Sequence, residues 1–226
     1  MFHDFINLFY PKTCNCCERP LVDHEKVICT ACLHQLPLTN YLTDNENQAD
    51  KVFYGRTPIN AAYALLVFRK KNMVQVLLHN LKYKRQFEIS YFLGEWTGEI
   101  LKNSARFNAV DIIVPVPLHK NRLKQRGYNQ VEGFGKEIAK SLNANYRDDL
   151  LLKVSSSRKQ AFKNRISRWN LMEQSFQLTD TSAISGKHIL LVDDILTTGA
   201  TLEACIGCLR KSEKIKISIA TMAITI

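Results

Sequence analysis

Several common signatures are missing from this chain of 226 residues, and each absence excludes a class of protein. No apolar run approaches the ~20 residues that a membrane-spanning helix requires. The first segment, MFHDFINLFYPK, lacks a basic start and carries Asp4 inside its apolar stretch, so we expect no secretory signal. No G-x-x-x-x-G-K-[ST] phosphate loop occurs, and Gly133 and Gly135 are followed by Ile138 where a dinucleotide fingerprint needs glycine. A membrane-spanning protein, a P-loop NTPase and a dinucleotide-binding enzyme are therefore not expected.

Acidic residues are also scarce: 21 Asp and Glu face 31 Lys and Arg, a net charge of +10. This excess favours anionic partners, namely phosphorylated metabolites, nucleic acid or acidic membranes. The 46% hydrophobic and 23% charged content is typical of a globular protein. The length suits one sizeable domain with a small module. Seven cysteines without an export signal favour a cytoplasmic location and metal binding over disulfides.

Four of the cysteines form two C-x-x-C pairs with eleven residues between them: Cys14, Cys17, Cys29 and Cys32. Two paired thiolates on two tight turns are typical of a tetrahedral structural zinc site. A segment of about 45 residues is too short for its own core, so a metal would supply much of its folding free energy. We therefore predict a zinc-ribbon-like module over residues 1–45. Cys16 is an additional thiol that makes the ligand set less certain.

The most informative stretch is HILLVDDILTTGAT, residues 188–201. Its continuous apolar run predicts a strand buried on both faces of a parallel sheet, and ATLEACIGCLRKSEK predicts a helix directly after it. Unpaired N–H groups at that helix start, together with Gly199 and neighbouring threonine hydroxyls, indicate a phosphate cradle. Asp193 and Asp194 lie one step before the cradle and suit sugar hydroxyls or a phosphate-bound Mg²⁺. A ribose 5-phosphate would satisfy both halves.

Apolar patterns elsewhere predict an α/β fold with strands and helices in alternation. We expect strands at 61–70, 110–117, 150–154 and 215–226, and helices at 73–84, 88–102 and 129–142. The last strand should return beside residues 188–193 through a right-handed connection. Residues 40–60 are polar and are interpreted as a linker. Cys205 and Cys208 are expected to be small core residues.

Two basic segments stand out. One follows the prolines of 115–117 as a loop with four cations, Lys120, Arg122, Lys124 and Arg126. The other, 155–170, has aromatic residues between its cations, including Arg165 and Arg168. The first fits an anion-binding turn, a solvated loop or a nucleic-acid patch. The second fits a closing lid or a single-stranded nucleic-acid platform. Lys82, Lys84 and Arg85 could face an anion, but for these residues alone we favour a solvated helix end that the helix dipole stabilises.

The 188–201 stretch resembles the 5-phosphoribosyl 1-pyrophosphate (PRPP) motif of type I phosphoribosyltransferases. Over the whole chain, the order of C-x-x-C twice, PVPLHKNRLKQRGYNQ, and LLVDDILTTGAT is similar to the ComF family, which joins a zinc module to such a domain. The resemblance implies a type I phosphoribosyltransferase-like parallel sheet flanked by helices over residues 46–226.

The resemblance also implies roles for individual residues. Asp193 and Asp194 would meet the ribose hydroxyls or Mg²⁺. The 5-phosphate would lie on a loop of five residues: Thr197, Thr198, Gly199, Ala200 and Thr201. The pyrophosphate would lie on a second loop: Val116, Pro117, Leu118 and His119. No catalytic residue and no base-recognition element is identified by this pattern.

The resemblance further implies a role in DNA uptake during natural transformation, with single-stranded DNA and DNA-processing proteins as partners. Transfer of the ribosyl group from PRPP would be the reaction of such a domain. The alternative is a phosphoribosyltransferase of nucleotide salvage or biosynthesis that acts on a small acceptor and has no contact with DNA. The zinc module and the basic segment with aromatics favour the first hypothesis, whereas the PRPP motif alone fits both.

Overall fold

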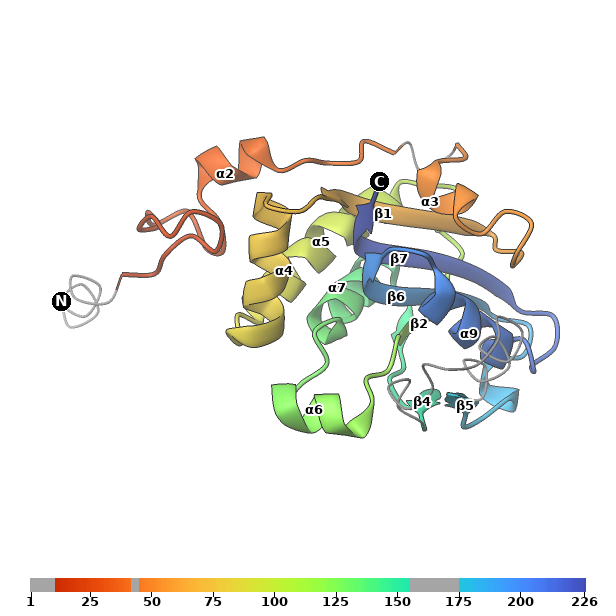
Figure 1. Ribbon diagram of the computed structural model, residues 1–226. Coiled ribbons are helices and arrows are strands. Elements are labelled where there is room, and N and C mark those ends of the chain that lie inside the picture. Colours follow the sequence, from red (N-terminus) through yellow and green to blue (C-terminus); the bar gives the residue numbers. More distant parts are fainter. Residues whose placement is uncertain (1–10, 42–44, 155–174) are drawn as a thin grey trace.

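A five-stranded parallel sheet in the order β1-β7-β6-β2-β3 forms the centre of the molecule (Figure 1). The computed structural model describes residues 11–41, 45–154 and 175–226. The strands are β1 (Ala61–Phe68), β2 (Ile112–Pro115), β3 (Asn145–Tyr146), β6 (His188–Leu196) and β7 (Lys216–Thr225). β6 lies between β2 and β7, as its continuous apolar run predicts, and the parallel β6–β7 pair is confirmed.

Helices cover both faces of this sheet. On one face lie α4 (Met73–Tyr83), α5 (Glu88–Lys102) and α7 (Glu132–Leu142), and on the other lies α9 (Ala200–Leu209). α5 and α7 approach closely at Gly94, where there is no side chain between them. A Cβ at this position would lie 2.7 Å from the Phe134 carbonyl oxygen. The two resulting cores meet opposite sides of β6: Leu190 and Val192 belong to the first, Ile189 and Leu191 to the second. The predicted helices at 73–84, 88–102 and 129–142 are confirmed.

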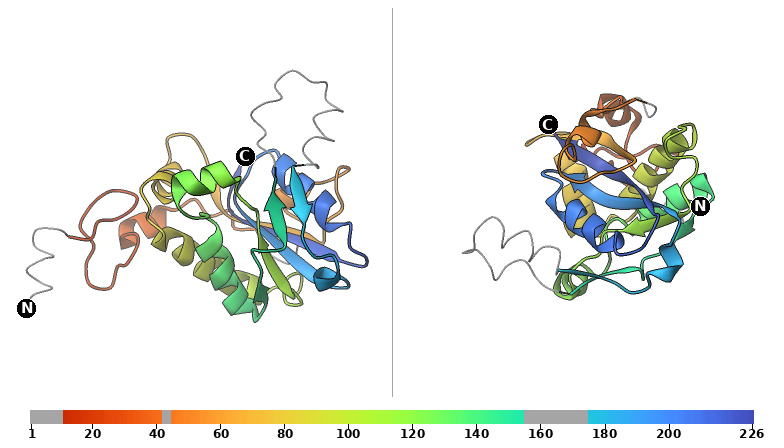
Figure 2. Two further views of the ribbon diagram at one scale, coloured as in Figure 1. Left: turned by 90° about the horizontal axis from the view of Figure 1, so that it is seen from below. Right: turned by 90° about the vertical axis from the view of Figure 1, so that its right-hand side faces the viewer.

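A small antiparallel sheet lies below the main sheet (Figures 1 and 2). It pairs β4 (Leu151–Lys153) with β5 (Phe176–Leu178), and the short 3-10 helix η2 (Ser182–Ile184) follows. The predicted strand at 150–154 therefore exists, but it is not part of the parallel sheet. The predicted basic segment 155–170, with Arg165 and Arg168, lies outside the described residues.

The interpretation of residues 40–60 as a linker is wrong over the described part, 45–60. This part contains α3 (Gln48–Lys51), capped by Asn47, and the buried side chain of Phe53. Its polar groups bond to the edge of the sheet: Asp50 Oδ1 accepts from the Ala62 N–H at 2.7 Å, and Asn47 Nδ2 donates to the Ala62 carbonyl at 3.0 Å. Polarity here reflects hydrogen bonding to β1 rather than solvation.

The N-terminal cysteine module, defined here as residues 11–36, lies beside α4 at one end of the sheet (Figures 1 and 2). It holds one helix, α2 (Thr30–Gln35). The following segment reaches β1, where the Thr39 N–H donates to the Leu65 carbonyl and the Val67 N–H to that of Pro37. The boundary at residue 45 stays a prediction. Across the described residues, every helix is too short or too polar to cross a membrane.

Candidate functional site

The predicted phosphate cradle lies where β6 turns into α9. β6 continues through Asp193 and Asp194 to Leu196, and Thr197 and Thr198 are exposed. Gly199 then caps α9 with a left-handed φ of 76° and has no side chain to bond to the helix start. The Ala200 N–H makes one long hydrogen bond, 3.5 Å, to Thr198 Oγ1. The first N–H groups of α9 are thus directed to the loop, where the helix dipole adds partial positive charge. This is the geometry of an anion site at a helix N-terminus.

Residues 52–56 support the cradle from behind. The Arg56 guanidinium donates to the Thr198 carbonyl at 2.8 Å and pairs with the Glu203 carboxylate at 2.6 Å. A Cβ at Gly199 would lie 3.0 Å from Val52 and 3.1 Å from Phe53, so a side chain there would strain the loop. The segment expected to be a linker therefore shapes the loop.

Asp194 is the buried member of the acidic pair, and two side chains from distant segments bond to it. Lys82 Nζ of α4 lies 2.8 Å from Asp194 Oδ2, and Gln130 Nε2 donates to the same oxygen at 2.7 Å. Arg126 Nη1 in turn donates to Gln130 Oε1 at 2.6 Å. The interpretation of Lys82 as part of a solvated helix end is wrong, because its ammonium compensates a buried carboxylate.

Asp193 has different surroundings. Its side chain is partly exposed, and its Oδ1 accepts from the Asp194 N–H at 2.8 Å. Burial and the Asp194 charge raise the pKa of Asp193 to about 8, against the lowering effect of Lys82 and Lys153. Burial also lowers the pKa of Lys153, which ends β4, and the nearby Arg122 acts in the same direction. Several cations thus converge on the acidic pair from separate elements.

The predicted pyrophosphate loop lies beside the acids because β2 pairs with β6. Pro115 is opposite Val192, and the Val116 N–H donates to the Val192 carbonyl at 2.9 Å. Asn129 Nδ2 holds the Val116 carbonyl at 3.1 Å. The carboxyl ends of neighbouring parallel strands lie at the same edge of a sheet. The cradle after β6 therefore shares its edge with the loop after β2, which consists of Val116, Pro117, Leu118 and His119.

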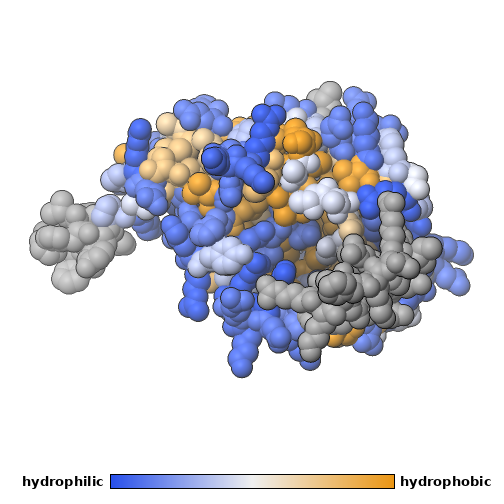
Figure 3. Space-filling view, in the orientation of Figure 1, coloured by the Kyte–Doolittle hydropathy of each residue, from blue (hydrophilic) through white to orange (hydrophobic). Residues whose placement is uncertain are grey.

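The basic segment after this loop is a short helix, α6 (Lys120–Arg126), and not the predicted loop. His119 Nδ1 accepts from the Asn121 N–H at its start, and Gly127 ends it with a φ of 82°. Three of its cations are exposed, namely Lys120, Arg122 and Lys124, whereas Arg126 is partly buried. Figure 3 shows a hydrophilic surface over this helix.

Sequence reasoning missed four residues of this site: Arg56, Lys82, Gln130 and Lys153. Gln130 stands in the R-G-Y-N-Q run that carries the family resemblance, so a signal for it existed. Arg56, Lys82 and Lys153 contact segments that are far away in the chain, and no local sequence pattern predicts these contacts.

The second candidate site is the cysteine cluster of the N-terminal module. The Sγ atoms of its four cysteines lie within 4.8 Å of one another: Cys14, Cys17, Cys29 and Cys32. Cys17 Sγ and Cys29 Sγ are 3.7 Å apart, and tetrahedral zinc with Zn–S bonds of ~2.3 Å separates its sulfurs by ~3.8 Å. The predicted ligand set therefore fits a metal ion.

Backbone N–H groups prepare Cys14 to act as a thiolate. Burial raises its pKa, but N–H groups of Cys29, Cys17 and Cys16 outweigh burial and lower the pKa to about 6. The Cys16 N–H lies 3.4 Å from Cys14 Sγ, and its own thiol stands outside the cluster. Burial, with the nearby Cys14, raises the pKa of the Cys16 thiol to about 12. Cys16 thus supports the cluster through its backbone N–H, and its thiol is not one of the four clustered sulfurs.

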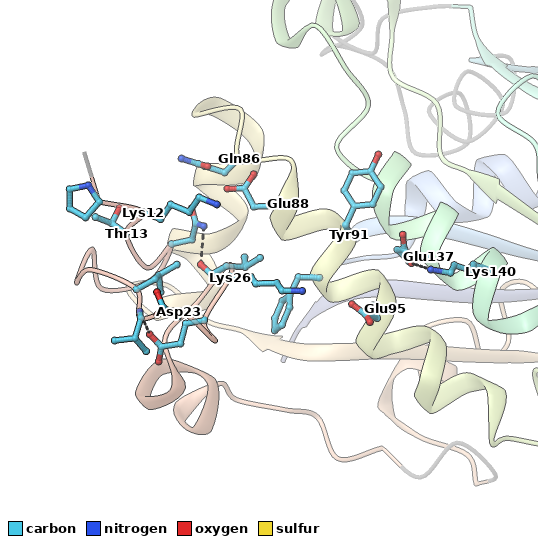
Figure 4. A pocket seen from close by; sticks show the side chains of 17 residues that line it. Lys12, Thr13, Asp23, Lys26, Gln86, Glu88, Tyr91, Glu95, Glu137 and Lys140 are labelled. Atoms are coloured by element: carbon cyan, nitrogen blue, oxygen red, sulfur yellow. Dashed lines mark hydrogen bonds and ion pairs between the residues drawn. The ribbon is translucent and has the colours of Figure 1, made fainter. Parts of the chain in front are cut away.

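A groove of about 1280 Å³ separates the module from α5 and α7 (Figure 4). Its lining mixes acidic and basic side chains, among them Asp23 and Lys26 of the module and Glu88 and Glu95 of α5. The groove lies outside the loops at the carboxyl ends of β2 and β6, and therefore does not form part of the candidate anion site.

Comparison with known proteins agrees with this geometry. The family model described as "Phosphoribosyl transferase domain" matches residues 132–223. Competence protein F of Haemophilus influenzae is 25% identical over 142 residues, which are 61% of this chain and 62% of that protein. Competence protein ComFC of Bacillus subtilis is 28% identical over 149 residues, 66% of this chain and 58% of that protein. These matches agree with the resemblance of this chain to the ComF family.

A third relative is DNA utilization protein YhgH of Escherichia coli K12, 28% identical over 129 residues, 56% of each chain. The chain spans less than two thirds of the length of these relatives. A solved hypoxanthine phosphoribosyltransferase from Staphylococcus aureus matches 60% of this chain and 62% of its own, at 16% identity and a TM-score of 0.34, a likeness too low to support an inference about function.

Proposed function

We propose that this chain binds PRPP with Mg²⁺ at the carboxyl ends of β2 and β6, and acts with single-stranded DNA in DNA uptake. The glycine at the start of α9, beside a partly exposed carboxylate, Asp193, is the observation that carries the binding proposal. The loop of residues 197–201 would hold the 5-phosphate. The pyrophosphate would lie on residues 116–119 at the same sheet edge. Asp193 and Asp194 supply the carboxylates for the sugar or for Mg²⁺.

Contact with single-stranded DNA is supported by charge and by the relatives. Two relatives are named competence proteins and another a DNA utilization protein. In the described part of the chain, α6 presents Lys120, Arg122 and Lys124 to solvent next to the same loops. Exposed cations of this kind bind phosphates without sequence preference. Arg165 and Arg168 stay candidates for the same surface.

We also propose structural zinc on the cysteine cluster and a division of the chain at residue 45. The donor set of four sulfurs supports zinc, since thiolates favour it over harder ions. When bound, the ion would fix the two turns of the module, and no open position would remain for chemistry.

The test is a calorimetric titration of PRPP with Mg²⁺, first alone and then with single-stranded DNA already bound. Micromolar PRPP binding that shifts when DNA is bound would support the proposal, and the coupling must be reciprocal. PRPP binding that is indifferent to DNA would favour the small-acceptor phosphoribosyltransferase. No PRPP binding would show that the cradle is not a working site.

The DNA surface is tested by replacing Lys120 and Lys124 with Ala together. The slope of log affinity against log salt is negative, and each lost phosphate contact should reduce its magnitude by about 0.7. The matched control replaces Lys211 and Lys214, which are exposed at the opposite end of the strands. Equal effects in both variants would show that only net charge matters and would contradict a DNA site on α6.

A further inference from the structure

The two adjacent acids of β6 are not equivalent in their bonding. Asp194 Oδ2 already accepts from Lys82 and from Gln130, and its side chain is 8% exposed. Asp193 is partly exposed, and among the described residues its side chain accepts one hydrogen bond, from the neighbouring backbone. Asp193 is thus the acid available to a ligand, and Asp194 is occupied in holding other side chains.

The contacts of Asp194 connect Lys82 to the loop of residues 116–119, where the pyrophosphate is proposed to lie. Lys82 Nζ and Gln130 Nε2 share one oxygen and are therefore within about 5.5 Å of each other. Gln130 directly follows Asn129, which bonds to the Val116 carbonyl of the 116–119 loop. The 5-phosphate cradle is at the opposite end of the acidic pair, at Gly199. The Lys82 side chain is 20% exposed.

Several further contacts fix the surroundings of this lysine. The Arg126 guanidinium donates to Gln130 Oε1 at 2.6 Å and lies 5.5 Å from the centre of the Tyr83 ring. Ser90 Oγ donates to the Gln130 carbonyl at 2.8 Å. The ends of α4 and α6 and the start of α7 are thus joined around the Lys82 ammonium. A lysine held this way is pre-organised for an anion, because little side-chain freedom is lost when the anion binds.

We infer that Lys82 is a further ligand-binding residue, which pairs with the pyrophosphate of the bound sugar phosphate while Asp194 and Gln130 act as positioning residues. This inference rests on the proposed function. A charge-assisted hydrogen bond from an ammonium to phosphate is stronger than a neutral one. The lysine should therefore discriminate ligands that carry a pyrophosphate from those that do not.

The experiment compares PRPP with ribose 5-phosphate, both with Mg²⁺, by calorimetry on the full chain. Lys82→Met should weaken PRPP binding about tenfold or more and change ribose 5-phosphate binding no more than about twofold. Lys84→Met is the matched control, because Lys84 is exposed two positions away and lies 3.8 Å from the exposed Glu18. It should leave both ligands unaffected.

A second variant separates ligand binding from mere support of Asp194. Lys82→Met leaves the buried Asp194 charge without its cation, and adding Asp194→Asn removes that charge. The reference is Asp194→Asn alone, which accounts for any contact of Asp194 with the ligand. If Lys82 binds the ligand, the double variant is more stable than Lys82→Met but binds PRPP about tenfold more weakly than Asp194→Asn. Equal PRPP affinity in the double variant and in Asp194→Asn would overturn the inference. So would an equal loss of both ligands in Lys82→Met. If the wild-type chain binds neither ligand, the proposed function fails and the inference falls with it.

Discussion

The cysteine module and the five-stranded sheet reach order by different means. In the module, the buried hydrophobic residues are few, and three of them are cysteines of the cluster, Cys14, Cys29 and Cys32. Its one helix, α2, has six residues. In the sheet, β6 and β7 bury nearly every side chain between two layers of helices. The module therefore lacks the apolar burial that stabilises the sheet, and the zinc ion proposed for its four sulfurs would supply the missing stabilisation.

Removal of metal is the strongest way to break this comparison. Chelation, or Cys29→Ser, should unfold the module and leave the sheet intact, because structural zinc contributes about 10–16 kcal/mol in small modules. Hydrogen exchange should show loss of protection at the Cys16 and Cys29 amides, which donate to Cys14 Sγ. The amides of β6 and β7 should keep theirs.

Cys16→Ser is the control for this experiment, since its thiol lies outside the cluster. It should retain stoichiometric metal. Loss of metal in Cys16→Ser, or unfolding of the sheet on chelation, would contradict the division between the two regions.

The β1 edge of the sheet carries a buried ion pair whose loss should destabilise the fold. Arg106 pairs with the buried Asp50 through two bonds, at 2.7 and 3.1 Å. Arg106→Met should cost about 3 kcal/mol in urea unfolding, because a buried carboxylate loses its cation. Lys187→Met is the matched control: its pair with Asp111 is exposed on both sides, and its loss should cost less than about 1 kcal/mol. Equal costs would show that burial of Asp50 is unimportant.

The sequence predicted the elements whose patterns are long and local. The β6 run, the helical spacing of α4 and the spacing of the four cysteines each carried their own signal. The prediction of a linker was wrong over residues 45–60 because we interpreted polar residues as solvated. The side chains of Asn47 and Asp50 instead form hydrogen bonds with β1. The α6 helix was missed because its seven residues, four of them basic, have no apolar face to reveal it.

The candidate site divides in the same way. Residues 193–201 form one continuous stretch, so their grouping was visible in the sequence. The contact between Lys82 and Asp194 joins positions separated by more than a hundred residues, and only the packing of α4 against the sheet brings them together. Tertiary contacts of charged side chains are set by the fold and have no periodicity.

The contact that joins the two regions should have a smaller effect. Asn80 of α4 is buried, and its Nδ2 donates to the Asn15 carbonyl of the module at 3.0 Å. Asn80→Ala should cost about 1–2 kcal/mol, since it leaves a buried carbonyl without its donor. Asn103→Ala removes an exposed amide that bonds within its own helix region, and should cost about 0.5 kcal/mol or less. No difference between the two variants would show that the module is not tied to α4 by this bond.

The smallest effect is a pH dependence confined to the sheet. His188 is buried at the start of β6, where its Nε2 lies 2.8 Å from Ser218 Oγ. Burial and the Lys216 charge lower the pKa of His188, and the Asp111 carboxylate has the opposite effect. The unfolded chain, with a histidine pKa of about 6.5, therefore binds this proton more readily than the folded chain. Stability should fall as the pH drops below about 6.5, and the dependence ends once the folded histidine is protonated.

The variant that isolates this effect is His188→Gln, which keeps a hydrogen-bonding group but cannot titrate. Its unfolding free energy should change less than that of the wild type between pH 7 and 5, measured by urea unfolding at each pH. Asp111 does not obscure the result: its pKa is lowered, chiefly by the hydrogen bond from the His188 N–H, so its contribution is lost only as the pH falls through about 4 and below. Parallel pH profiles for the wild type and His188→Gln would show that His188 is not the group responsible.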